Sequence, residues 1–255
     1  LELIRYEKAR EILRDGSVRE NEFAIPVEHS VTVCVNGREV MEISCTGQYL
    51  AEVILGRLLT AGIIEDAKEV ESVCVSESGE VGEVILREPK GQWNTECRLS
   101  PVEPVMWEKE WVFALADRLA DGMPLHQETF AVHSCFLSMR GKLLFACEDI
   151  GRHNAFDKVI GYALRNQIDL RQCIVYSSGR IPVDMAVKAI RAGIPVLAAM
   201  SLLSFLFGGV MSVFYAVTQA FTGLVFGGCL HGKVDMTKTM FAVMILSAVV
   251  SVLNT

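Results

Sequence analysis

Two short loops carry side-chain types that commonly bind anions. The first, residues 148–154, holds two carboxylates, a guanidinium and an imidazole between an expected strand and an expected helix. Within it, Asn154 is expected to cap the helix and Asp149 to pair with Arg152. Because ligands of open α/β sheets bind beyond the carboxyl ends of strands, Arg152 and His153 are candidate binding residues. A capped turn with an internal ion pair is the alternative for this loop.

The second loop, residues 177–182, also leads from an expected strand into an expected helix. Its Ser178 and Gly179 are small enough for the backbone to approach a ligand, and Arg180 can bind an oxyanion through two parallel hydrogen bonds. The loop lacks the lysine and spacing of a P-loop, and a G-x-G-x-x-G run is absent. A plain turn is the alternative for this loop alone, but two such loops on successive strands favour a shared phosphate site.

Cys97 differs from the other cysteines because it lies in a proline-rich loop, residues 88–104. The adjacent Arg98 favours the reactive thiolate form, whereas Glu96 opposes it. Cys97 is therefore the candidate nucleophile. The remaining cysteines are scattered through apolar stretches without a C-x-x-C pair. This pattern predicts reduced, mostly buried thiols in a cytoplasmic protein.

Four side chains of metal-ligand types lie close together in the sequence: His133, Cys135, Cys147 and His153. Their spacings match no closed zinc pattern, and the H-x-E and P-C-x-x-C runs of zinc deaminases are absent. His133 and Cys135 are therefore expected to be core residues. A metal-dependent hydrolase that uses residues of this set is an alternative function.

The elements that must position these residues change in character along the chain. We expect, in order, a helix over 1–17, a hairpin over 28–45, a helix over 48–59, a strand pair over 70–87 and a helix over 107–119. Strands then alternate with helices, the strands over 130–139, 142–147, 173–176 and 194–199, the helices over 154–164 and 183–192. This order predicts an α/β protein with a mixed sheet covered by helices on both faces, and a β-rich N-terminal subdomain. The boundary is placed between 1–104 and 105–255.

Charge is distributed unevenly along the 255 residues. The net charge of −7 argues against non-specific nucleic-acid binding. Of the 24 basic and 31 acidic residues, only Lys233, Asp235 and Lys238 follow Arg191. The uncharged run 201–230 is long enough to span a membrane, but its glycines, its polar residues and the absence of flanking cations favour buried elements and an apolar dimer surface. The charged N-terminus lacks the apolar core of a secretory signal, so none is expected.

These motifs resemble the formate dehydrogenase accessory sulfurtransferases, the family of FdhD-type sulfur carriers. The resemblance rests on EDIGRHNAFDKVIG (148–161), SSGRIPVDMAVKAIRAGIPVLA (177–198) and VTVCVNGREV with the helical run after it. It implies a sulfur carrier that accepts persulfide sulfur from a cysteine desulfurase. The sulfur would pass to the molybdenum bis-molybdopterin guanine dinucleotide cofactor of formate dehydrogenase. The resemblance also implies a cytidine-deaminase-like fold that lacks the zinc site, so no resident metal is expected.

The resemblance further implies roles for particular residues. Cys97 would carry the persulfide, although Ser100 stands where many members have a second cysteine. One thiolate is enough for this chemistry, and a cofactor-binding chaperone without sulfur transfer is the alternative that the missing cysteine permits. Residues expected to bind the phosphates or orient the cofactor are Arg152, His153, Ser178, Gly179 and Arg180.

Residues 224–233 are the plausible counterpart of the family's C-terminal nucleotide-binding segment. The expected contacts of the guanine nucleotide, or of GDP as its mimic, are Gly228, Cys229, Leu230, His231, Gly232 and Lys233. The expected partners are a cysteine desulfurase, formate dehydrogenase and a second copy of the chain.

Overall fold

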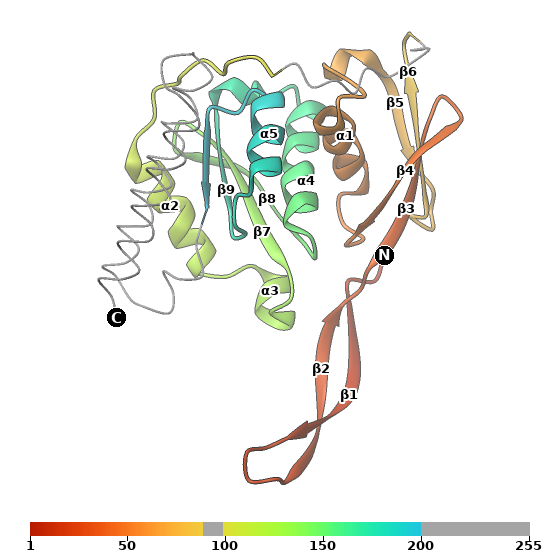
Figure 1. Ribbon diagram of the computed structural model, residues 1–255, viewed down its shortest axis with the longest axis vertical. Coiled ribbons are helices and arrows are strands. Elements are labelled where there is room, and N and C mark those ends of the chain that lie inside the picture. Colours follow the sequence, from red (N-terminus) through yellow and green to blue (C-terminus); the bar gives the residue numbers. More distant parts are fainter. Residues whose placement is uncertain (89–98, 200–255) are drawn as a thin grey trace. The chain divides into compact units, whose positions relative to one another are not determined.

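The computed structural model describes residues 1–88 and 99–199 (Figure 1). Several predicted features lie outside these residues: the Cys97 thiol, the uncharged run 201–230 and the nucleotide contacts at 228–233.

The described residues other than 100–102 belong to one compact unit. The predicted boundary between residues 104 and 105 stays a prediction. Among the described residues, the helices are too short or too polar to cross a membrane.

The chain begins with an antiparallel ribbon formed by β1 (Ile4–Ile12) and β2 (Val18–Pro26). The two strands pair over their full length, from Ile4 opposite Pro26 to Ile12 opposite Val18. The prediction of a helix over 1–17 is therefore wrong. Helix propensity is a weak preference, and here cross-strand pairing around a turn at Gly16, whose φ is 85°, overrides it.

The next sheet contains four strands in the order β4-β3-β6-β5, and it confirms both predicted strand pairs. Asn36 and Gly37 form the hairpin turn with positive φ angles of 51° and 76°, a conformation that asparagine and glycine adopt readily. The strands are β3 (His29–Val35), β4 (Arg38–Cys45), β5 (Val70–Val75) and β6 (Val81–Leu86).

The third sheet confirms the predicted mixed α/β arrangement. Its order is β10-β9-β7-β8, with β9 and β10 parallel and the other neighbours antiparallel. The ends of β8 and β9 and the start of β7 therefore meet at one edge. The cytidine-deaminase-like detail stays a prediction. The strands are β7 (His133–Met139), β8 (Lys142–Asp149), β9 (Cys173–Ser177) and β10 (Val196–Ala199).

Helices cover both faces of this third sheet, as predicted. On one face α4 packs against β7 and β8, and on the other α2 contacts β9. Along β9, Cys173 and Val175 join the main hydrophobic core, whereas Ile174 and Tyr176 are buried outside it. The helices are α1 (Leu50–Ala61), α2 (Lys109–Ala120), α3 (Pro124–Thr129), α4 (Arg152–Arg165) and α5 (Val183–Arg191), with 3-10 turns η1 (Ala67–Glu69) and η2 (Leu170–Gln172).

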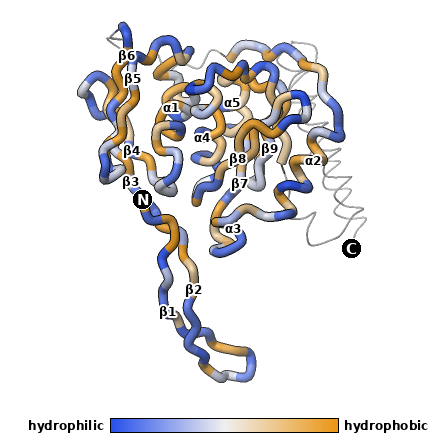
Figure 2. Tube along the Cα trace, turned by 180° about the vertical axis from the view of Figure 1, so that it is seen from behind, coloured by the Kyte–Doolittle hydropathy of each residue, from blue (hydrophilic) through white to orange (hydrophobic). Residues whose placement is uncertain are grey.

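A close contact between α1 and α4 joins the second and third sheets into one core (Figure 1). A Cβ atom on Gly56 would lie 1.9 Å from the Asp157 carbonyl oxygen, and one on Gly161 would lie 1.8 Å from that of Glu52. Only glycine permits this backbone approach. Hydrophobic residues dominate α1 at this contact, whereas hydrophilic residues make up much of the β1–β2 ribbon (Figure 2).

Candidate functional site

The two predicted loops meet at the edge where β8 and β9 end. A Cβ atom on Gly179 would lie 2.8 Å from Arg152 Cβ and 3.0 Å from its Cδ, so the arginine side chain lies directly over the glycine. Ser178 is fixed to β7, because its backbone N–H donates to the Ser134 carbonyl and its Oγ accepts from the Ser134 N–H, both at 2.9 Å. The structure therefore brings Arg152, Ser178 and Gly179 together, and we call this place the junction.

Arg152 has an unmet hydrogen-bonding group at this junction. Its Nε atom is buried and has no hydrogen-bond partner among the described residues. A buried guanidinium donor without an acceptor is costly, and a phosphate oxygen is an acceptor that arginine binds well. The junction of Arg152 with Gly179 therefore has the chemistry of an anion site.

The other two candidates in these loops lie apart from the junction. His153 points toward α5, where its Nε2 lies 3.3 Å from Asp184 Oδ2. Burial and the charge of Lys188 lower the pKa of His153, although Asp184 acts in the opposite direction. Arg180 is exposed to solvent one residue beyond Gly179. The structure does not bring His153 and Arg180 into the contact between Arg152 and Gly179.

His133 belongs to the junction and was missed as a binding residue. It is half-buried at the first position of β7, between the ends of β8 and β9, and its Nδ1 lies 3.4 Å from Ser178 Oγ. Burial and the nearby charge of Arg152 lower its pKa. The expectation that it is a core residue is thus wrong. A prediction of strand order, with β7 between β8 and β9, would have placed it here.

Asp149 holds the turn before Arg152, but its ionic partner differs from the predicted one. Asp149 Oδ2 lies 2.6 Å from Lys158 Nζ, with both side chains fully buried. Its Oδ1 accepts hydrogen bonds from the Gly151 N–H at 2.9 Å and from Asn154 Nδ2 at 3.0 Å. The predicted pairing of Asp149 with Arg152 is wrong, because a buried lysine requires this carboxylate.

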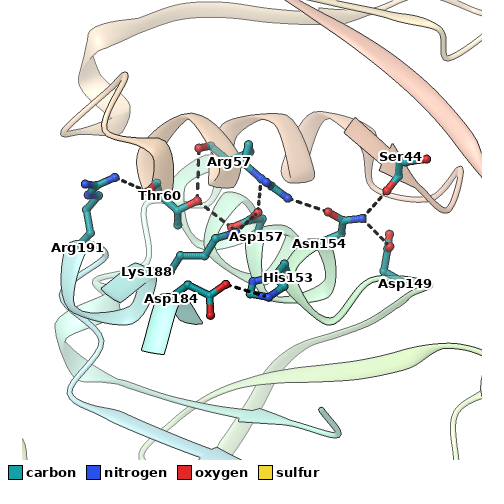
Figure 3. A network of polar contacts seen from close by, with 10 residues as sticks. All are labelled: Ser44, Arg57, Thr60, Asp149, His153, Asn154, Asp157, Asp184, Lys188 and Arg191. Atoms are coloured by element: carbon teal, nitrogen blue, oxygen red, sulfur yellow. Dashed lines mark hydrogen bonds and ion pairs between the residues drawn. The ribbon is translucent and has the colours of Figure 1, made fainter. Parts of the chain in front are cut away.

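Asn154 is not the helix cap that the sequence suggests. The helix α4 begins two residues earlier, at Arg152, and Gly151 occupies the capping position without a side-chain hydrogen bond. Asn154 instead crosslinks the fold, since its Nδ2 donates to the Ser44 carbonyl at 2.6 Å and its Oδ1 accepts from Arg57 at 2.9 Å (Figure 3).

Asp157 is the centre of a second buried ionic cluster that sequence reasoning did not identify (Figure 3). Its carboxylate lies 2.6 Å from Arg57 Nε and 2.7 Å from Lys188 Nζ, and it accepts a hydrogen bond from Thr60 at 2.9 Å. These partners come from α1 and α5. The cluster therefore fixes α4, which begins with Arg152, between two other helices.

Most thiols of the described residues are poor nucleophiles. Burial raises the pKa of Cys45 to about 12 and that of Cys173 to about 11. Burial also raises the pKa of Cys135 and Cys147 far above the ordinary thiol range. A thiol must ionise to attack sulfur, so these four remain inert near neutral pH. Cys74 is exposed on β5 and provides an accessible control thiol.

The ligand set required by the hydrolase alternative is not assembled. The described residues contain no group of three His, Cys, Asp or Glu side chains placed to hold a metal ion. Cys135 and Cys147 are buried opposite each other in β7 and β8, while His153 faces Asp184.

A cavity of about 270 Å³ lies away from the junction, between β1, α3 and β8. Glu148 on its wall accepts hydrogen bonds from the backbone N–H groups of Leu125 and His126, at 2.9 Å and 2.7 Å. Glu148 is thus engaged in holding the start of α3. The predicted phosphate-binding residues that the structure describes do not line this cavity.

Comparison with known proteins supports one family over most of the chain. The sequence is 28% identical to the sulfur carrier protein FdhD of Bacillus subtilis (strain 168), over 73% of this chain and 80% of the relative. It is 27% identical to the sulfur carrier protein FdhD of Halalkalibacterium halodurans, over 74% and 79%. A crystal structure described as a formate dehydrogenase accessory protein from Desulfotalea psychrophila matches with a TM-score of 0.68 and 26% identity. That match covers 79% of this chain and 86% of the other.

The family profile covers the junction and the segments on both sides of it. The profile described as the FdhD/NarQ family matches residues 26–100 and 89–206. These ranges include Arg152, His133, Ser178 and Gly179, together with Cys97. The chain therefore belongs to the FdhD/NarQ family.

Proposed function

We propose that this protein is a sulfur carrier for formate dehydrogenase maturation. It would accept sulfur from a cysteine desulfurase and deliver it to the molybdenum bis-molybdopterin guanine dinucleotide cofactor. The cofactor is thus the acceptor of the sulfur. The observation that carries the proposal is the family match over residues 26–206, with relatives named as sulfur carriers. The junction of Arg152 with Gly179 supports the part that concerns the cofactor.

The phosphate groups of the cofactor provide the acceptors that the junction lacks. Arg152 would donate to a phosphate oxygen through its buried Nε, and the Gly179 backbone leaves room for close approach. Ser178 would add a hydroxyl donor beside them. Residues 228–233 are proposed to contact the guanine nucleotide, and the exposed Arg180, which follows Gly179, is proposed to contact an outer phosphate.

The sulfur transfer itself is assigned to Cys97. Its thiolate would attack the terminal sulfur of the desulfurase persulfide, forming a new S–S bond at Cys97. The S–S bond of the donor breaks at the same time, and the desulfurase cysteine leaves as a thiolate. One sulfur atom moves, and the reaction needs neither oxidant nor reductant. Ser100 takes no part, because a single thiolate completes the exchange.

Mass spectrometry after incubation with a cysteine desulfurase and cysteine tests this assignment. We expect a mass increase of one sulfur atom on Cys97, lost in Cys97→Ala and retained in Cys74→Ala, which removes an exposed thiol. Cys97→Ala should also fail to restore formate dehydrogenase activity in cells that lack the native carrier.

The outcome also separates the proposal from the chaperone alternative. Absence of the adduct on Cys97, under conditions that load a control carrier, together with restored formate dehydrogenase activity in Cys97→Ala, would support a cofactor-binding chaperone without sulfur transfer. An adduct that persists on Cys74 alone would move the carrier role to β5.

A further inference from the structure

His133 lies where three elements of the phosphate site converge. It starts β7, and its imidazole faces the Ser178 hydroxyl in the loop after β9. The charged or titratable groups around it are Arg152 on α4, His126 on α3 and Asp149 at the end of β8. Asp149 is already paired with a buried lysine, so Arg152 is the neighbouring cation with an unsatisfied donor among the described residues.

We propose that His133 is a further binding residue of this site and takes up a proton from solvent when a phosphate group binds beside Arg152 and Gly179. This inference rests on the proposed function, because it requires the junction to bind the phosphates of a nucleoside diphosphate. It goes further by naming a third side chain and by making binding depend on pH.

The hydrogen bonds around Ser178 are compatible with this proton uptake. Ser178 Oγ accepts the Ser134 N–H, so its own hydrogen is free to be donated to His133 Nδ1. In this proposal Nδ1 accepts that hydrogen in the empty site, and Nε2 carries the hydrogen of the neutral ring. Once His133 is protonated, Nδ1–H donates to Ser178 Oγ instead. The Ser178 hydroxyl hydrogen then turns to the phosphate.

The charges of the site give the direction of the pH dependence. Burial and the charge of Arg152 hold the pKa of His133 below its usual value when no anion is present. A phosphate dianion beside the ring favours the charged form and raises that pKa. Affinity therefore increases as the pH falls through the pKa of the complex, and it becomes constant below the pKa of the free protein.

Calorimetric titration of the full chain with GDP tests this inference. Titrations at pH 7.5 in buffers of different ionisation enthalpy report the protons taken up on binding. We expect net uptake in the wild-type protein and none in His133→Gln. Protonation of the ligand cannot explain such uptake. Its terminal phosphate, with a pKa of about 6, releases any residual proton on binding to a cation.

The affinity should follow the same pattern between pH 8 and pH 6. For the wild type we expect the Kd to fall about tenfold for each unit by which the ligand raises the pKa of His133. His133→Gln should lose this dependence, and Ser178→Ala should weaken binding at low pH. His29→Gln is the matched control, because His29 lies on β3 and bonds to the Glu2 carbonyl. This substitution should leave proton uptake on GDP binding unchanged.

Each result separates this inference from the proposal on which it rests. GDP binding with equal proton uptake in wild type and His133→Gln would overturn the role of His133 and leave the phosphate site in place. Uptake lost in His153→Gln instead would assign the proton to His153 and also overturn the inference. Complete absence of GDP binding to the wild type would overturn both.

Discussion

Arg152 and Lys158 lie six residues apart on one helix, yet their charges are satisfied in different ways. Lys158 is fully buried, and its Nζ has Asp149 at 2.6 Å and Thr46 Oγ1 at 2.7 Å. Arg152 lies against Gly179 with a buried Nε that has no partner within the described residues. A cation whose hydrogen bonds are complete stabilises the fold, whereas a cation that lacks acceptors is suited to bind a ligand.

The same difference separates Asp149 and Asp157 from His133. Asp149 and Asp157 are engaged by partners from several elements, and they hold the first turn of α4 in place. His133, which comes from a different strand, shares the open part of the site with Ser178. The motif at 148–158 therefore combines a rigid support with one side of a binding site.

Lys158→Met should give the largest effect and should act on folding. It leaves the buried carboxylate of Asp149 without its cation, which costs about 3–5 kcal/mol of the free energy of unfolding. Urea denaturation followed by circular dichroism measures this loss. Lys109→Met, on an exposed lysine of α2, is the control and should change stability by less than about 1 kcal/mol. Equal stability of the two variants would contradict the structural role of Lys158.

Gly179→Ala should give an intermediate effect and should act mainly on binding. The new Cβ would lie 2.8 Å from Arg152 Cβ, so the arginine must move from the junction. A displacement of this kind costs about 1–3 kcal/mol, which corresponds to a rise of about 5-fold to 140-fold in the Kd for GDP. The measurement is titration calorimetry, with thermal unfolding of the same samples.

A double-mutant cycle identifies the cause of that loss. If Gly179→Ala acts by moving Arg152, it should have little further effect in an Arg152→Ala background, because the effects of neighbouring groups are not additive. Full additivity of the two substitutions would show that Gly179 acts independently of Arg152.

His153→Gln should give the smallest effect, although His153 is adjacent to Arg152 in sequence. Its ring faces the largely exposed Asp184 on α5, so we expect less than about 1 kcal/mol of lost stability. The Kd for GDP should change by less than about threefold. Asp184→Asn should reproduce the small change in stability. A loss of affinity as large as that of Gly179→Ala would place His153 within the binding site after all.

The sequence predicts those features that depend on short-range pattern. Alternation around Asn36-Gly37 predicts the hairpin, and helical spacing predicts α1 and its end at Gly62, whose φ is 76°. The two loops that carry Arg152 and Gly179 are found because small and charged residues between a strand and a helix are typical of anion sites.

Long-range pairing accounts for what the sequence does not predict. Residues 4–12 fit a helical pattern, but their pairing with 18–26 decides their conformation. The choice of Lys158 over Arg152 as the partner of Asp149 depends on which side chain is buried. His133 enters the site through strand order, which no local pattern contains.

GDP binding to Arg152→Gln, compared with binding to Arg171→Gln, tests whether Arg152 binds phosphate. Arg171 is an exposed arginine paired with Asp169 and serves as a matched loss of one positive charge. We predict that Arg152→Gln raises the Kd for GDP at least about tenfold, because it removes one charge-assisted hydrogen bond to the phosphate. The Tm should not change. Arg171→Gln should bind as the wild type does. Equal affinity of the two variants would contradict the claim that the junction of Arg152 and Gly179 is the phosphate site.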